Sequence, residues 1–124
     1  MIERLRRIIT RRRGVIISPF LCQLFSVVVS VGGITLWPFI IFREAPSEVD
    51  ERHERIHLKQ QAELLVLGFY AVYVYDWLRN RARGFTSTDA YMLIRFEQEA
   101  YANERDPQYL AKRKPWAWLD YRAP

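Results

Sequence analysis

Residues 53 to 57 read His-Glu-Arg-Ile-His and contain both histidines of the 124-residue chain. A helix repeats about every 3.6 residues, so side chains four positions apart share a face. On a helix, His53 and His57 would bring two imidazole nitrogens together, where both can bind one metal ion. Glu54 would lie beside the vacant side of that ion, close enough to accept a proton from bound water. Unless the spacing is a coincidence on a charged surface helix, this segment must be helical, and a further ligand must reach it from elsewhere.

The predicted helix has a clear beginning. Ser47 follows a proline and can cap the helix, and three acidic residues come in the first turn: Glu48, Asp50 and Glu51. The pattern continues through Gln61 into 64–75, which is apolar on every face, and basic residues and Gly84 end it. A helix that is apolar all round lies either in a protein core or in lipid.

A second helix is predicted from about Asp89 to Glu104, with a cap available in 86–88. Asp106-Pro107 then stops that helix and starts a short last one. The tail, 112–121, interleaves aromatic and basic residues. Such a tail suits membrane headgroups and suits packing on the core equally well.

The second predicted helix supplies the candidates for a third metal ligand. A hydrolytic zinc site commonly takes three protein ligands and keeps one position for water. The chain has no third histidine, so the donor must be a carboxylate, and the helix offers Glu97, Glu99 and Glu104. Glu97 and Glu99 lie about 200° apart around a helix, so at most one of them can bind the ion. Without the histidine pair, Glu97 would read as part of a solvated face.

The pairing of His-Glu-x-x-His with a downstream Glu-x-Glu-Ala, at 97–100, resembles the gluzincins, a family of zinc metallopeptidases. The resemblance implies that Glu97 is the third ligand to Zn²⁺ and that Glu99 is a neighbour that orients a histidine or serves as an alternative ligand. Tyr101 stands where gluzincins often have an acid. From about Gly33 to its end, the chain also resembles a group of small uncharacterised bacterial zincin-like proteins with His-Glu-Arg-Ile-His and Phe-Glu-x-Glu-Ala-Tyr. The implied fold is mainly α, a minimal zincin-like α or α+β domain.

Topology constrains the apolar part of the first helix. If 62–78 crossed a bilayer, His57 and Glu97 would lie on opposite sides of it, and 89–104 is too polar to cross back. A metal site at Glu97 therefore makes this part a core helix or one lying in the membrane interface.

The segment 14–42 contains no charged residue and is long enough to cross a bilayer as a helix. Six arginines lie in residues 4 to 13, so the positive-inside rule keeps the N-terminus in the cytoplasm. We expect a retained membrane helix, since 30–33 makes a poor cleavage site for a secretory signal. The alternative for the second half is a strand over 34–42, which is rich in β-branched and aromatic residues.

Composition limits the remaining possibilities. The net charge of +5 comes from the basic arm, 1–13, so a nucleic-acid-binding face on the rest of the chain is not supported. Cys22 is the only cysteine, which excludes a disulfide or a cysteine-based metal site within one chain. The expected organisation is this arm, the hydrophobic segment 14–42, and one helical domain, 43–124.

The leading hypothesis is a membrane-associated zinc peptidase that acts on a peptide or protein substrate. Glu54 would be the general base, and Tyr101, Tyr91 or Arg95 would donate to the oxyanion. One alternative is a non-catalytic structural or assembly protein with a zinc-pinned or vestigial site. A third class is a basic anchor that binds nucleic acid or anionic lipid through 1–13.

Overall fold

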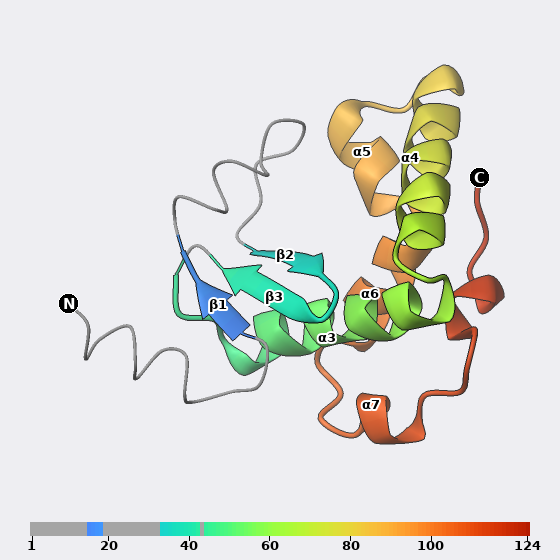
Figure 1. The fold of residues 1–124 in the computed structure, drawn as a ribbon. Coiled ribbons are helices and arrows are strands. Elements are labelled where there is room, and N and C mark those ends of the chain that lie inside the picture. The colour runs from blue at the N-terminus through green and yellow to red at the C-terminus, as the bar shows by residue number, and fades with distance from the viewer. Residues whose placement is uncertain (1–14, 19–32, 43) are drawn as a thin grey trace.

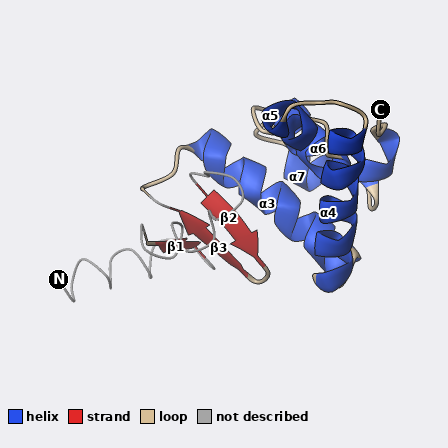
Figure 2. Cartoon of the chain, turned by 90° about the horizontal axis from the view of Figure 1, so that it is seen from above, coloured by secondary structure: helices blue, strands red, loops and turns tan. Residues whose placement is uncertain are grey.

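The computed structural model in Figures 1 and 2 describes residues 15–18, 33–42 and 44–124. A small sheet lies against one helix, α3 (Glu48–Glu63), and the other helices pack on α3 and on one another. The expected mainly α class is confirmed, with a small β component. The basic arm and much of the hydrophobic segment lie outside the described residues.

The sheet has three strands in the order β1-β3-β2: β1 (Val15–Ile17), β2 (Gly33–Leu36) and β3 (Phe39–Phe42). β1 runs parallel to β3, whereas β2 and β3 form an antiparallel hairpin in which Leu36 lies opposite Phe39. β2 packs on α3. The hairpin therefore places an edge strand beside the helix that carries the histidines (Figure 1).

The expectation of a membrane helix over 14–42 is wrong for residues 33–42. The strand alternative is closer, although this stretch forms two strands, with Trp37 and Pro38 in the turn. Proline lacks a backbone donor, and the β-branched and aromatic residues around it favour strands. Ile40 and Phe42 are buried in a cluster with Val15. In the part of the chain that the structure describes, no helix combines the length and the apolar character needed to cross a bilayer.

The beginning of α3 is as predicted. The Ser47 side chain accepts a hydrogen bond from the backbone N–H of Asp50 at 3.1 Å, and the Asp50 carboxylate accepts one from the backbone of Ser47 at 3.3 Å. This reciprocal capping satisfies two otherwise unpaired donors of the first turn. The helix that presents the histidines therefore starts at a defined position.

The prediction of one continuous helix through the apolar stretch is wrong. α3 ends at Glu63, and a separate helix, α4 (Leu67–Ala82), rises steeply from its end (Figure 1). Between the two, Leu65 and Val66 both have a φ of 56°. Side chains of this size rarely adopt that conformation, so the residue types at these two positions do not predict the break. The change of direction brings Phe69 of α4 against the ring of His57.

The second predicted helix is also two helices, α5 (Ser87–Met92) and α6 (Arg95–Asn103). The expected cap is confirmed at Thr86, whose hydroxyl accepts from the backbone N–H of Asp89 at 3.1 Å. Ile94 separates the helices with an extended backbone, and its side chain is fully buried. α6 then packs against α3.

The C-terminal part contains the expected short helix, α7 (Tyr109–Lys112), followed by one 3-10 turn, η1 (Ala117–Asp120). Trp118 is buried and packs edge-on against Phe96 of α6, whereas Trp116 is 44% exposed. Of the two alternatives for the tail, packing on the core therefore holds at Trp118.

Candidate metal centre

Three buried side chains converge between α3 and α6: His53, His57 and Glu97. The two Nε2 atoms lie 3.2 Å apart, and each is near one oxygen of Glu97, at 3.0 Å for His53 and 3.1 Å for His57. The three residues are only 7%, 4% and 3% exposed, respectively. Among the described residues they form a group that could hold a metal ion. The structure thus brings together the three ligands predicted from the sequence.

The spacing of the two imidazole nitrogens fits a tetrahedral ion. Ligands at about 2.0 to 2.1 Å from the centre of a tetrahedron are about 3.3 Å apart. The two Nε2 atoms are 3.2 Å apart, and each lies close to a different oxygen of Glu97, Oε2 for His53 and Oε1 for His57. Two imidazole nitrogens and one of these oxygens would occupy three corners, which leaves the fourth for water or another ligand.

Charge explains how the metal-free cluster holds together. Burial lowers the pKa of His57, but the charge of Glu97 and hydrogen bonding to it outweigh burial, so that the pKa rises to about 9. Burial raises the pKa of Glu97, yet the neighbouring imidazoles bring it well below its ordinary value. A protonated His57 therefore faces an ionised Glu97 near neutral pH. A divalent ion would take the place of that proton.

The second ring nitrogen of each histidine is also occupied. His53 Nδ1 lies 2.7 Å from an oxygen of Glu104, and His57 Nδ1 lies 2.7 Å from Oε1 of Gln60. A proton on Nδ1 that is donated to these oxygens leaves the Nε2 lone pairs free for a metal. The partners thus fix both the ring orientation and the tautomer that metal binding requires.

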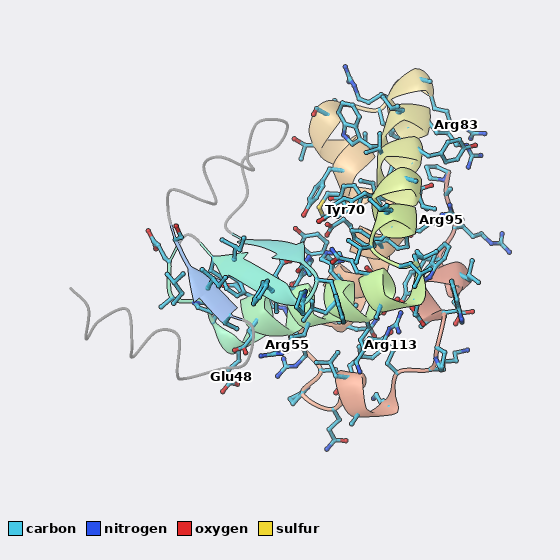
Figure 3. All side chains as sticks on the ribbon, viewed as in Figure 1. Glu48, Arg55, Tyr70, Arg83, Arg95 and Arg113 are labelled. Atoms are coloured by element: carbon cyan, nitrogen blue, oxygen red, sulfur yellow. The ribbon has the colours of Figure 1, made fainter. Side chains whose placement is uncertain are left out.

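Glu99 is fully buried but lies outside the metal group. Its carboxylate accepts hydrogen bonds from Tyr109 at 2.9 Å and from Arg113 at 2.7 and 3.0 Å. Arg113 lies beneath the C-terminal part of α3 (Figure 3). Gln60 donates to Glu99 at 3.3 Å and also contacts His57. Glu99 is therefore connected to an imidazole through Gln60 and is not brought to the ligand atoms.

The predicted general base, Glu54, is half-buried on α3 and contacts the edge strand. The hydroxyl of Thr35 in β2 donates to Glu54 Oε2 at 2.6 Å. After burial and the charge of Glu97, the charge of Glu54 also raises the pKa of Tyr73 and of Tyr91. The negative charges of Glu54 and of Glu97 therefore both raise the pKa of Tyr73 and of Tyr91.

The three predicted oxyanion donors differ in position. The ring of Tyr101 lies edge-on to that of His53, with centroids 4.4 Å apart, and the hydroxyls of Tyr101 and Tyr91 are 3.1 Å apart. Arg95 is engaged elsewhere, because its guanidinium group donates to both oxygens of the buried Asp76 at 2.9 Å. The structure therefore does not support Arg95 as an oxyanion donor.

Sequence reasoning missed two partners of the ligands, Tyr73 and Gln60. Tyr73 donates to Glu97 at 3.0 Å, and Gln60 holds His57. Gln60 is one helical turn after His57, so helical spacing could have suggested it. Glu104, which the sequence offers as a candidate metal ligand, instead lies at the Nδ1 atom of His53. Tyr73 lies beyond the break between α3 and α4, and no local signal places it at the site.

Comparisons with protein-family models, with curated proteins and with solved structures found no match.

Proposed function

We propose that this protein is a membrane-associated, zinc-dependent hydrolase of gluzincin type that cleaves peptide bonds. The observation that carries the proposal is the convergence of His53, His57 and Glu97. Glu54 lies on α3, the helix that also carries the two histidines. Two imidazole nitrogens and one carboxylate oxygen are a ligand set of catalytic zinc sites. The 3.2 Å distance between the two Nε2 atoms and the occupied Nδ1 atoms support a site prepared for such an ion.

A bound zinc ion would acidify a water molecule and polarise a carbonyl group. Glu54 would accept one proton from that water as its oxygen bonds to the carbonyl carbon. The same carboxylate would deliver the proton to the amide nitrogen as the C–N bond breaks. The hydrogen bond from Thr35 holds one oxygen of Glu54 and leaves the other for this transfer. Tyr91 and Tyr101 supply hydroxyl donors for the negative oxygen.

The edge strand fixes the position of the proposed base. β2 lies at the edge of the sheet beside α3. The Thr35 carbonyl accepts from Gln61 at 2.8 Å and from Tyr70 at 2.6 Å, which occupies both of its lone pairs. These bonds hold β2 in place, so that the Thr35 hydroxyl stays at Glu54.

A second candidate is a non-catalytic protein in which the metal pins α3 to α6. The burial of the three ligands favours it, because side chains that are 3% to 7% exposed leave little room for a substrate. A structural site, however, commonly has four protein ligands. The group found in the described part of the chain has three.

The test is zinc content and peptide hydrolysis in the full chain. His57→Ala and Glu97→Ala should both lower zinc content and abolish cleavage, whereas Glu54→Gln should keep the metal and lose cleavage. The matched control is Glu48→Gln, which neutralises an exposed carboxylate on the same helix. Cleavage that survives Glu54→Gln would contradict the proposed role of the base.

Cobalt substitution separates the two candidates. An open site should bind a hydroxamate, which would change the visible absorption of the Co²⁺ protein. A closed site with four protein ligands would leave the spectrum unchanged, and the hydrolase proposal would then fail in favour of the structural one.

A further inference from the structure

The outward face of α4 carries a continuous row of apolar side chains. The row consists of five exposed residues: Leu67, Ala71, Val74, Tyr75 and Leu78. Leu67 is 81% exposed, and Val74, Tyr75 and Leu78 are each more than half exposed. Their spacing by three and four positions places them on one helical face, over a length of about 16 Å.

The opposite side of α4 already packs on the protein. Phe69 lies in the core with Phe96, and the fully buried Asp76 pairs with Arg95. The helix is thus held in place without the outward row. A contiguous apolar surface that the core does not use is typical of a contact site.

Positive charge lies at the C-terminal end of this row. Arg81 continues the same face, with its guanidinium 6.0 Å from the Trp77 ring centroid, and Arg79 and Arg83 flank it. Figure 3 shows Arg83 extending from the end of α4. None of the three forms an ion pair with a carboxylate of the residues that the structure describes. Asp76 is the only acidic residue of α4, and it is buried.

We propose that this face of α4 binds the surface of a bilayer that contains anionic lipid. The apolar row would enter the boundary between headgroups and acyl chains, and the three arginines would lie among the phosphates. A lipid surface is bound by a continuous apolar row with cations beside it, and α4 presents both. Such a surface does not require a groove or another complementary shape on the protein. Binding through α4 requires no bound metal.

The test places a probe on the row in the full chain. Cys22→Ser removes the only cysteine, and an environment-sensitive fluorophore is then attached through Leu78→Cys or, as the control, through Lys59→Cys at an exposed position of α3. With vesicles of phosphatidylcholine and phosphatidylglycerol, the probe at 78 should shift to the blue and be quenched by nitroxide lipids. The probe at 59 should keep its aqueous emission.

Removal of two arginine charges tests whether the cations of α4 contribute to binding of anionic lipid. Arg81→Gln combined with Arg83→Gln should weaken binding to the anionic vesicles by about tenfold or more. An aqueous spectrum at position 78 in the presence of vesicles would overturn the proposal. A blue-shifted spectrum without vesicles, together with a dimer mass by light scattering, would also overturn it and would assign the face to a second copy of the chain.

Discussion

Two buried carboxylates on α6, Glu97 and Glu99, are only two positions apart but have opposite surroundings. Glu99 faces the guanidinium group of Arg113, with which it shares two hydrogen bonds, of 2.7 and 3.0 Å. Burial lowers the pKa of Arg113, but its hydrogen bonds to Glu99 and Glu63 raise it above the ordinary value. The positive partner of Glu99 is therefore permanent.

Glu97 instead faces His53 and His57, and an imidazole is positive only while it holds a second proton. A proton can be exchanged for a metal ion, whereas a guanidinium charge cannot. Two neighbouring buried acids on one helix can therefore have separate roles. The Glu99 cluster, which is Glu99 with Tyr109 and Arg113, is suited to hold the C-terminal segment in place. The Glu97 cluster, which is Glu97 with His53 and His57, is suited to bind an ion.

The largest expected effect comes from breaking the permanent pair. Arg113→Met leaves Glu99 buried without its cation and should lower the free energy of unfolding by about 3 to 5 kcal/mol. Urea unfolding measures this, and the loss should be the same with and without zinc. Lys112→Met, at an exposed neighbouring position, is the matched control and should leave the transition midpoint nearly unchanged. Equal stabilities for the two variants would show that the Glu99 cluster is not structural.

Metal addition should stabilise the protein only through the other cluster. At a free zinc concentration one hundred times the Kd, the wild-type protein should gain about 2.7 kcal/mol. Glu97→Ala should lose this gain, whereas Arg113→Met should keep it if it folds. Melting curves with zinc and with a chelator measure the difference. A full zinc-dependent shift in Glu97→Ala would move the ligand role to another residue.

Gln60 connects the two clusters, because it contacts both His57 and Glu99. Gln60→Leu removes the acceptor that orients His57 and should weaken zinc binding 10- to 100-fold, or about 1.4 to 2.7 kcal/mol. Competition with a zinc-binding dye measures the Kd. Gln61→Leu is the control, since Gln61 is equally buried but bonds to β2 and Tyr70. An unchanged Kd in Gln60→Leu would show that the hydrogen bond between His57 and Gln60 does not affect zinc binding.

The most gradual expected effect is the pH dependence of the metal-free protein, because it is spread over more than two pH units. The pKa of His57 is raised from 6.5 to about 9 in the folded state. A raised pKa stabilises the fold fully below the unfolded value, and this stabilisation is lost as pH rises from 6.5 through 9. The slope can reach at most about 1.4 kcal/mol per pH unit. Unfolding curves measured across that range should show the loss, and saturating zinc should remove it. A flat profile for the metal-free protein would argue against an imidazolium at His57.

The ligands of the site could be predicted from the sequence because helical spacing is local. The His53 and His57 spacing specified one face of a helix, and the capping residues specified where that helix begins. Glu97 followed from the need for a third donor and from the resemblance to gluzincins. All three side chains meet in the structure.

The remaining features depend on contacts between distant segments. The break at Leu65 and Val66 has neither the glycine nor the proline that usually marks one, and only the packed structure maintains the positive φ values. The position of Tyr73 follows from that break. The less favoured alternative from the sequence is a single strand over 34–42, and the hairpin within 33–42 is not predicted, because an uncharged run is long enough for a membrane helix whether or not proline interrupts it.

X-ray absorption spectroscopy of the zinc-loaded full chain would identify the ligands of the ion. We expect one zinc ion per chain, with two imidazole nitrogens at about 2.0 Å, one carboxylate oxygen and one oxygen from outside the protein. The imidazole signal should fall in His57→Ala. A protein that binds no zinc stoichiometrically, or that binds it without imidazole ligands, would contradict the account.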